Sequence, residues 1–411
     1  MNWPKVSWKK IEEKQEAIQL PASKSISNRL LILRAISTNT FRIDNLSKAN
    51  DTQLLEKILS HPTLPPILNC QDAGTAYRFL TCLCATKNNE YLLQGTPRLL
   101  HRPMTPLIVA LRQLGAVIKE PAHDKNTGLV VIGTSLKSSP LQVKGNVSSQ
   151  FISALCLIAS EIDEGLDLQI EPPVYSKPYI QMTLQLLKQF GVQSHFKKNN
   201  IRIEKQALVA NNIQVEADWS SACFFYCLLM LTDEISSLRI NELQEDSIQG
   251  DSAIHKIAKQ FGVDTTFEAK GVTLQKTKKV NAHKKINLED FPDLAVPLLT
   301  VAAFAYSGFV FTGLSHLEHK ESNRITALAT NLSKFGIELH NEAGSLSFNQ
   351  KEKIPNKRSV RIETFNDHRI AMSFSLLAVL GYDIQLDNAS CVDKSFPDFF
   401  KEVSKLGFSL H

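Results

Sequence analysis

The sequence predicts an α/β protein that is built from six repeated units in two pseudo-symmetric halves. Two observations lead to this fold class. Amphipathic segments with a shared ending recur at near-constant spacing, and more apolar helical segments alternate with them along the chain. Short strand-like runs lie between the two kinds of segment. Neither end shows a polar capping repeat, so we expect two halves and not an open solenoid.

Five amphipathic segments contain a basic residue and end in a large apolar residue followed by glycine. These glycines are Gly115, Gly191, Gly262, Gly336 and Gly407, separated by 76, 71, 74 and 71 residues. Each stands where a helix needs a left-handed C-terminal residue. An earlier amphipathic segment, DTQLLEKIL from Asp51, completes the set of six but lacks the terminal glycine.

Six further helices are rich in Ala, Leu, Phe and Cys and carry few charges, which is typical of helices buried on most sides. They are predicted to begin near Ile26, Ala73, Gln150, Ser221, Leu294 and His368. The predicted strands are the runs LVVIG, LDLQI, IRIE, LRIN, FVFTGL, VRIE and IQLD. We therefore expect units of about 70 residues, each with one buried helix, one surface helix and short strands.

The composition indicates a globular protein of two or three domains, with 411 residues, 43% hydrophobic and 21% charged. The net charge of +5 permits an anionic small molecule without demanding nucleic acid. Seven cysteines, mostly in apolar runs, favour a reducing compartment over a disulfide framework. The N-terminal segment lacks the apolar core of a signal peptide, and the apolar run from Leu294 to Phe311, interrupted by Pro297, is expected to be a buried helix and a strand. These features predict a cytoplasmic protein.

Basic side chains gather at the predicted helix N-termini, which is the unfavourable end for a positive charge because the helix dipole is already positive there. The nine residues concerned are Lys24, Arg29, Arg78, Arg102, Lys177, Lys320, Arg324, Arg369 and Lys394. Helix N-termini and cations together bind phosphate and carboxylate groups. Capping alone is expected to explain Asp51, Asp251 and Ser220 at similar positions. The pattern therefore predicts anionic ligands.

Several common catalytic motifs do not occur in the sequence. There is no G-x-x-x-x-G-K-[ST] loop, no G-x-G-x-x-G after a strand, no H-E-x-x-H, no Cys/His metal set and no G-x-S-x-G. We therefore expect no P-loop or dinucleotide fold, no metal site and no serine nucleophile.

A series of motifs at these helix starts resembles the enolpyruvyl transferase family, in particular the branch that acts on shikimate 3-phosphate. They are LPASKSISNRLLIL at 20–33, DAGTAYRFLT, RPMTPL, VSSQFISAL, SKPYI, the segment around Glu216 and Asp218, QGD, FPDLA, HKESNR, NDHRIAM and KSFPDFF, in the family's order. The resemblance implies a two-domain inverted αβ barrel of the EPT/RTPC-like type, with three βαβαββ repeats in each domain. It places one domain at 21–216 and the other at 1–20 with 217–411, and the active site in the cleft between them, with domain closure on substrate binding.

The resemblance also implies an activity. The enolpyruvyl group of phosphoenolpyruvate is expected to pass to the 5-hydroxyl of shikimate 3-phosphate through a non-covalent tetrahedral ketal that expels phosphate. This is a step of the shikimate pathway to chorismate and the aromatic amino acids. It needs no cofactor and no metal, and we expect a monomer without nucleic-acid or membrane partners.

Site residues follow from the same resemblance, motif by motif. Shikimate 3-phosphate is expected to contact Lys24, Ser25, Arg29, Ser148, Ser149, Gln150, Ser176, Tyr179, Asp293, His316 and Lys320. Phosphoenolpyruvate is expected to contact Lys24, Gly74, Arg102, Gln150, Arg324, Arg369 and Lys394. The reaction needs an acid for the methylene carbon, a base for the hydroxyl and cations around the leaving phosphate. Asp293, Glu321 and Lys24 are the candidates, with the division of roles left open.

Four residues depart from the family's pattern: Asp72, Phe79, His316 and Asn323 stand where the family usually has Asn, Pro, Asn and Asp. Asp72 could cap a helix or be held neutral. His368 is interpreted as orienting its neighbours, with direct proton transfer as the alternative. Gly74 resembles the type that is sensitive to glyphosate.

Two other functions compete with this interpretation. A sister enzyme acts on UDP-N-acetylglucosamine, but it carries a Cys in the loop that corresponds to 95–102, where this chain has none. An RNA-binding module is suggested by the isoelectric point of about 8.7. The cations are spread over helix starts and not gathered in one run with aromatic residues, which argues against RNA.

Overall fold

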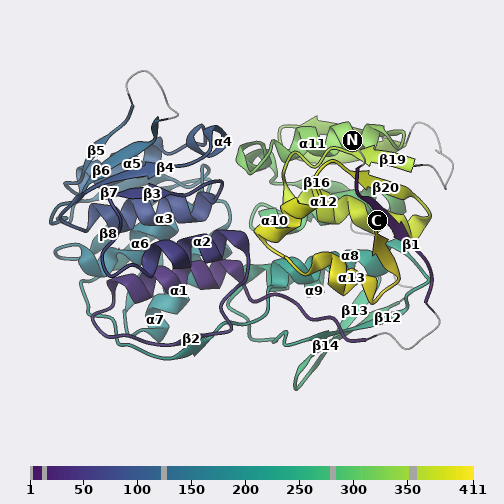
Figure 1. Ribbon diagram of the computed structural model, residues 1–411, viewed down its shortest axis with the longest axis horizontal. Coiled ribbons are helices and arrows are strands. Elements are labelled where there is room, and N and C mark those ends of the chain that lie inside the picture. The colour runs from purple at the N-terminus through teal and green to yellow at the C-terminus, as the bar shows by residue number, and fades with distance from the viewer. Residues whose placement is uncertain (1–2, 12–15, 122–126, 278–283, 307, 351–358) are drawn as a thin grey trace. The chain divides into compact units, whose positions relative to one another are not determined.

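The computed structural model describes residues 3–11, 16–121, 127–277, 284–306, 308–350 and 359–411. The chain divides into two compact units. The N-terminal unit comprises residues 23–215, and the C-terminal unit comprises residues 1–22 and 216–411 (Figure 1). The family resemblance predicts domain limits at 20/21 and 216/217.

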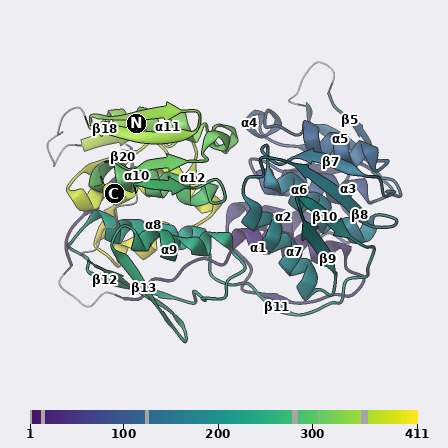
Figure 2. The same ribbon diagram turned by 180° about the vertical axis from the view of Figure 1, so that it is seen from behind.

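The N-terminal unit contains two four-stranded sheets with the same topology. Their strand orders are β3-β4-β6-β5 and β7-β8-β10-β9. In each sheet the first two strands are parallel and the remaining pairs are antiparallel. Figure 2 labels the four strands of the second sheet, β7 to β10. The strands are β3 Ile67–Asn69, β4 Glu90–Gln94, β5 Val117–Lys119, β6 Leu129–Ile132, β7 Leu141–Lys144, β8 Leu166–Glu171, β9 Ser194–Lys197 and β10 Asn200–Ile203.

Two of the three sheets of the C-terminal unit repeat this topology, and the third, β12-β14-β13, has three antiparallel strands. The sheets of this unit are β12-β14-β13, β15-β16-β18-β17 and β19-β20-β1-β21. The strands are β1 Lys5–Trp8, β12 Ser237–Asn241, β13 Val263–Glu268, β14 Gly271–Lys276, β15 Lys285–Asn287, β16 Val310–Thr312, β17 Ile337–Glu342, β18 Ser345–Gln350, β19 Ser359–Ile362, β20 Asp383–Leu386 and β21 Phe408–Leu410. All seven predicted strand runs lie in strands of the two units, which confirms the α/β prediction.

Six helices are largely buried, and all six begin within two residues of their predicted starts. They are α1 Lys24–Ile36, α3 Gly74–Ala85, α6 Ser149–Leu157, α8 Trp219–Leu231, α10 Pro292–Ala305 and α12 His368–Ser375. The apolar run from Leu294 forms the buried helix α10 and then β16, as predicted. Among the described residues, none of the helices is both long and apolar enough to cross a membrane.

Six amphipathic helices alternate with the buried ones. They are α2 Asn50–Leu59, α5 Thr105–Gln113, α7 Lys177–Gln189, α9 Ile254–Lys259, α11 Arg324–Ser333 and α13 Phe399–Ser404. The five predicted terminal glycines have φ angles of 103°, 80°, 78°, 73° and 92°. The backbone turns left-handed at each of them, as the sequence predicts. All seven cysteines are free, and six are buried.

Three strand positions are filled from distant parts of the chain. Strand β1 lies antiparallel between β20 and β21 and completes the last sheet (Figure 1). Ile18 forms a parallel bridge with Ile240, beside β12. In the N-terminal unit, β11 (Ile213–Gln214) pairs in parallel with β2 (Ile43–Asp44). These pairings close the repeat pattern, and they were not predicted from the sequence.

Candidate active site

The start of helix α1 carries the predicted ligand Lys24. The Ser23 hydroxyl caps the helix by accepting a hydrogen bond from the Ile26 amide at 3.4 Å. Lys24 occupies the first helical position, and its ammonium lies 3.4 Å from the carboxylate of Asp51 in the first turn of α2. Asp51 therefore forms an ion pair, and the prediction that it acts only as a helix cap is wrong.

Two guanidinium groups meet at the start of α3. A Cβ atom added to Gly74 would meet Nη1 of Arg102, and Nη1 of Arg78 at 2.8 Å. Arg78 donates to the Gly74 carbonyl at 3.0 Å and to Oε1 of Gln150 at 2.7 Å. The buried Nε of Arg102 makes no hydrogen bond within the described chain. Two cations at a helix N-terminus form a site for an anion.

Arg78 belongs to this group, although the predicted ligand sets omit it. The available signal was its position one helical turn after Gly74, which places both residues at the same end of α3. Gln150 was predicted as a ligand of both substrates. Its side-chain amide accepts from Arg78 and donates to the Thr75 hydroxyl of α3 at 3.1 Å.

A second predicted set converges on Arg29, whose side chain is buried. Its Nε donates to the Thr183 hydroxyl at 2.8 Å and its Nη1 to the Ser25 carbonyl at 2.8 Å. Its Nη2 donates to the Ser153 hydroxyl and the Tyr179 carbonyl, both at 3.1 Å. Four of the five N–H donors of Arg29 thus bind the protein. The structure brings Arg29, Ser25 and Tyr179 together, and Arg29 itself fixes their backbone.

The remaining predicted residues of this unit lie at the starts of α6 and α7. Ser148 caps α6 by accepting from the Gln150 amide at 3.3 Å, and Ser149 is the first helical residue. Ser176 precedes α7 with a φ of 57° and is buried. The Ser153 hydroxyl of α6 donates to the Tyr179 carbonyl of α7 at 3.4 Å, so the first turns of the two helices lie side by side.

In the C-terminal unit, Arg324 is enclosed by three carboxylates. The guanidinium nitrogens of Arg324 lie 2.9 Å, 2.9 Å and 3.4 Å from the carboxylate oxygens of Asp367, Glu321 and Asp293. Its side chain is 1% exposed, so these ion pairs lie away from solvent. Asp367 also caps α12 through the Arg369 amide at 3.0 Å. Asp367 was not among the predicted site residues, and its place before the helix was the available signal.

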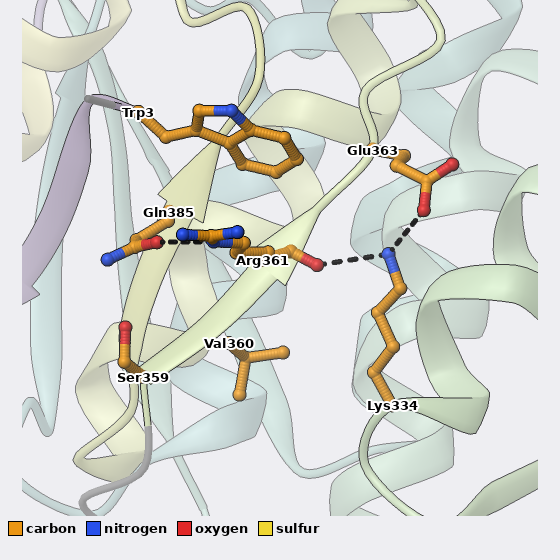
Figure 3. Close-up of a pocket in the computed structure, with 7 residues that line it drawn as sticks. All are labelled: Trp3, Lys334, Ser359, Val360, Arg361, Glu363 and Gln385. Atoms are coloured by element: carbon orange, nitrogen blue, oxygen red, sulfur yellow. Dashed lines mark hydrogen bonds and ion pairs between the residues drawn. The ribbon is translucent and has the colours of Figure 1, made fainter. Parts of the chain in front are cut away.

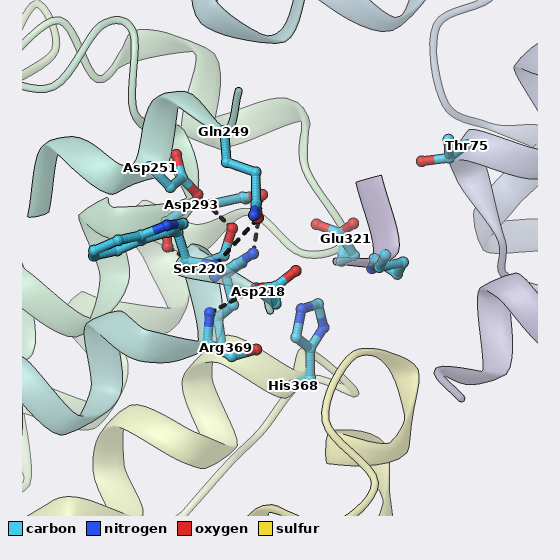
Figure 4. Close-up of polar contacts among 12 residues, drawn as sticks. Thr75, Asp218, Ser220, Gln249, Asp251, Asp293, Glu321, His368 and Arg369 are labelled. Atoms are coloured by element: carbon cyan, nitrogen blue, oxygen red, sulfur yellow. Dashed lines mark hydrogen bonds and ion pairs between the residues drawn. The ribbon is translucent and has the colours of Figure 1, made fainter. Parts of the chain in front are cut away.

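Arg369 binds Asp293 through two contacts. Its Nη2 lies 2.9 Å from the carboxylate, and its Nη1 donates to the Asp293 carbonyl at 2.8 Å (Figure 4). Burial alone would raise the pKa of Asp293, but Arg369, Arg324 and Lys320 outweigh it and hold this pKa well below its ordinary range. Asp293 is therefore ionised at neutral pH.

His316 lies in the short helical turn Ser315–His319 and is buried. Burial, followed by the charges of Lys320 and Arg324, lowers its pKa to about 3. Its imidazole is neutral at physiological pH and can donate one hydrogen bond. Lys320 and Glu321 follow this turn directly, so three predicted residues lie within a stretch of six.

Two further predicted residues lie in the C-terminal unit. Lys394 ends the turn Ser390–Lys394 and is half-buried. His368 is the first residue of α12, and its Nδ1 lies 3.9 Å from the Asp367 carboxylate. The interpretation of His368 as an orienting residue stays a prediction.

Asp251 and Ser220 form a hydrogen bond with each other through their side chains (Figure 4). The expectation that both are simple helix caps is wrong, because the contact joins two different elements. Asp251 is 2% exposed, and burial, followed by the charge of Asp293, raises its pKa to about 7. Asp251 was not predicted as a site residue, because its burial depends on the tertiary structure.

Three of the four departures from the family's pattern have local explanations. Asp72 accepts a hydrogen bond from the Thr96 hydroxyl at 2.5 Å and lies 3.5 Å from Arg98, so it is not a cap of α3. Asn323 caps α11 by accepting from the Thr326 amide at 3.1 Å. Phe79 is buried, and its ring centroid lies 5.5 Å from the Arg29 guanidinium carbon.

A hollow of about 610 Å³ in the C-terminal unit contains none of the predicted site residues (Figure 3). Arg361 lies 5.5 Å from the ring centroid of Trp3, and Lys334 donates to Glu363 at 2.9 Å. Its charges are thus bound to their neighbours. Within the described ranges, no cluster of three or more His, Cys, Asp or Glu side chains could hold a metal ion.

Comparisons with solved structures define the class of fold. The chain superposes on an EPSP synthase from Acinetobacter baumannii, solved at 2.37 Å, with a TM-score of 0.75, 23% identity and full coverage of both chains. It also superposes on the enolpyruvyl transferase NikO from Streptomyces tendae with a TM-score of 0.77 and 16% identity, covering 100% of this chain and 99% of the other. The predicted enolpyruvyl transferase fold is confirmed.

Sequence comparisons identify the family. The model of the EPSP synthase (3-phosphoshikimate 1-carboxyvinyltransferase) family matches residues 60–403. A 3-phosphoshikimate 1-carboxyvinyltransferase from Bacteroides fragilis is 36% identical over 394 residues, covering 96% of this chain and 95% of the relative. One from Haemophilus influenzae is 30% identical over 439 residues, covering 98% and 99%. The chain belongs to the EPSP synthase family.

Proposed function

We propose that this chain transfers the enolpyruvyl group of phosphoenolpyruvate to the 5-hydroxyl of shikimate 3-phosphate, with release of phosphate. Its membership of the EPSP synthase family supports this activity. The observation that carries it is the pair of guanidinium groups, Arg78 and Arg102, at the N-terminal end of α3. Both proposed substrates are polyanions, and arginine suits bidentate binding of carboxylate and phosphate.

Shikimate 3-phosphate is assigned to the hydroxyl-rich helix starts and the residues around Asp293. Its ligands are Lys24, Ser25, Arg29, Ser148, Ser149, Gln150, Ser176, Tyr179, Asp293, His316 and Lys320. Arg29 retains one N–H donor beyond its four bonds to the protein, which leaves room for one direct contact. His316, being neutral, contributes a hydrogen bond and no charge.

Phosphoenolpyruvate is assigned to the cationic residues. Its ligands are Lys24, Gly74, Arg102, Gln150, Arg324, Arg369 and Lys394, with Arg78 added beside Arg102. The Nε of Arg102 makes no bond within the described chain, so this guanidinium can turn to a ligand without breaking a contact there. Arg324 and Arg369 share their charge with Asp293, Glu321 and Asp367, so an incoming phosphate competes with these carboxylates.

The chemistry requires three proton movements. In the addition step the methylene carbon gains a proton, while the 5-hydroxyl oxygen attacks the neighbouring carbon and loses its proton. In the elimination step the new methyl group gives up a proton, the bond to the phosphate oxygen breaks, and the double bond re-forms as phosphate leaves. Asp293, Glu321 and Lys24 are placed in the acid and base roles. Asp293 is ionised in the free protein because Arg369 and Arg324 stabilise its charge. A phosphate that engages these arginines weakens that stabilisation, so substrate binding increases the proton affinity of Asp293.

The test is phosphate release from phosphoenolpyruvate by the purified chain. Release is expected only when shikimate 3-phosphate is also present, and no release with UDP-N-acetylglucosamine. Release with the UDP-sugar alone would reject the assigned acceptor, and tight RNA binding without turnover would favour a binding module.

The residue assignments are tested in the same assay. Lys24→Ala and Arg102→Ala are expected to lower kcat/KM by about 10²-fold or more while the circular dichroism spectrum stays unchanged. The matched control is Lys57→Ala, an exposed lysine of α2. Near-normal rates in either variant would refute its assignment.

The chain is further proposed to act as a cytoplasmic monomer without a metal or cofactor. Dialysis against EDTA should leave the rate unchanged, and light scattering should give a mass near 45.9 kDa. Loss of activity on chelation would contradict the first part, and a larger mass the second.

A further inference from the structure

The turn that precedes α3 holds a neighbouring segment in place. This segment, residues 95–102, is called the α4 segment. It contains the short helix α4, Pro97–Leu100, which is capped by the Thr96 hydroxyl. The Thr96 amide donates to the Gln71 carbonyl at 2.9 Å, and its hydroxyl donates to the Asp72 carboxylate at 2.5 Å. Nε of Arg98 lies 3.5 Å from the same carboxylate. Asp72 thus contacts two residues of the α4 segment.

The α4 segment leads directly to Arg102. The Arg102 amide donates to the Leu99 carbonyl at 3.1 Å, and the Leu99 side chain is buried. At Gly95 the backbone lies so close that a Cβ atom would meet the Gln71 carbonyl at 2.8 Å. The position of Arg102 against Gly74 therefore depends on how this segment docks on the 71–72 turn.

The charge of Asp72 also bears on the anion site. Asp72 stands two residues before Gly74, where Arg78 and Arg102 converge. A carboxylate at this position would repel a phosphorylated ligand unless a cation offsets it. Arg98 provides that cation. The side chains of Asp72 and Arg98 are 45% and 34% exposed, so their ion pair contributes little to folding.

We propose that Asp72 is a positioning residue for substrate binding: its carboxylate fixes the α4 segment so that Arg102 faces Gly74, and Arg98 neutralises that carboxylate. The proposal rests on the proposed function, because it concerns the affinity of the same site for phosphoenolpyruvate. Neither residue touches the substrate in this scheme. Asp72 acts through the position of the Arg102 side chain. Arg98 acts by offsetting the negative charge of Asp72 beside Arg102.

Four variants separate the positional effect from the charge effect. Asp72→Ala removes the acceptor for Thr96, so KM for phosphoenolpyruvate should rise about tenfold. Asp72→Asn keeps an acceptor oxygen and loses the charge, so binding should be at least as tight as in the wild type. Arg98→Gln removes the cation that pairs with Asp72, so KM should rise about tenfold. Combining Arg98→Gln with Asp72→Asn should restore KM to within about threefold.

Three readouts distinguish this role from a structural one. KM for phosphoenolpyruvate should change while KM for shikimate 3-phosphate and the melting temperature stay constant. Dissociation constants for phosphoenolpyruvate, measured by calorimetric titration in the absence of turnover, should rank the variants in the same order as KM. The matched control is Arg42→Gln, which breaks an exposed surface pair with Asp44 at 2.8 Å in the same unit and should change none of these quantities.

Each outcome decides part of the proposal. If Asp72→Ala and Arg98→Gln bind phosphoenolpyruvate within twofold of the wild type, the proposal is wrong. If the double variant is no better than Arg98→Gln, the neutralising role is wrong. A wild-type protein that binds phosphoenolpyruvate but never releases phosphate would overturn the proposed function, while the calorimetric order would still test Asp72.

Discussion

Asp251 offers a sharp test of the electrostatics of the C-terminal unit. Its carboxyl group is buried, hydrogen-bonds the Ser220 hydroxyl, and faces the charges of Asp293, Arg369 and Asp218. Burial raises its pKa from the ordinary 3.8 to about 7. The folded protein therefore holds a proton on Asp251 over a pH range in which the unfolded chain has lost it.

The sign and size of the effect follow from this difference. Because the folded state binds the proton more tightly, ionisation of Asp251 disfavours folding, and stability falls as pH rises from about 4 to about 7. At about 1.4 kcal/mol for each tenfold change in proton affinity, the full penalty is about 4 kcal/mol above pH 8. At pH 5 the same linkage gives only about 2 kcal/mol.

The perturbation is Asp251→Asn, which keeps a hydrogen-bonding side chain of the same shape but cannot ionise. The variant should be more stable than the wild type, and its advantage should grow by about 2 to 3 kcal/mol between pH 5 and pH 8. Groups that do not interact with Asp251 titrate alike in both proteins and cancel in the difference.

The assay is urea unfolding followed by tryptophan fluorescence. Trp3, Trp8 and Trp219 all belong to the C-terminal unit, so the signal reports the unit that contains Asp251. Asp246→Asn, a change at an exposed carboxylate, is the matched control. A stability difference that stays constant with pH, or that shrinks toward pH 8, would refute the reasoning.

Three further predictions follow. Gly74→Ala should raise KM for phosphoenolpyruvate about tenfold without loss of stability, because its methyl group displaces Arg102 and Arg78 while alanine favours the helix; an unchanged KM would contradict it. Arg324→Met should destabilise the C-terminal unit by about 3 to 5 kcal/mol, since three carboxylates lose their buried partner; a loss below about 1 kcal/mol in urea unfolding would count against this. Deletion of residues 1–10 removes β1 from between β20 and β21, so circular dichroism should show a partly unfolded protein; a native melting curve would exclude this role for β1.

Much of the candidate site could be predicted because its residues occupy helix starts. Gly74, Arg102 and Gln150 were expected from local motifs, and the structure places all three at or beside the start of α3. Asp367 and Asp251 were missed as site residues for a different reason. Their importance comes from burial against Arg324 and Ser220, which are distant in sequence.

The repeat itself was determined by the sequence. Helical periodicity and glycine placement are local properties, since a helix makes its hydrogen bonds within itself and needs a left-handed residue to end. They therefore appear in the order of residues, and the φ angles at Gly115 and Gly407 agree with them.

Only the tertiary structure decided how the repeats close. Strand β1 takes the last place in the sheet of β19, β20 and β21, and β11 pairs with β2 across about 170 residues. A strand forms its hydrogen bonds with another strand, and nothing in a short segment such as Lys5–Trp8 specifies which one. The partner is chosen by the packing of the whole unit.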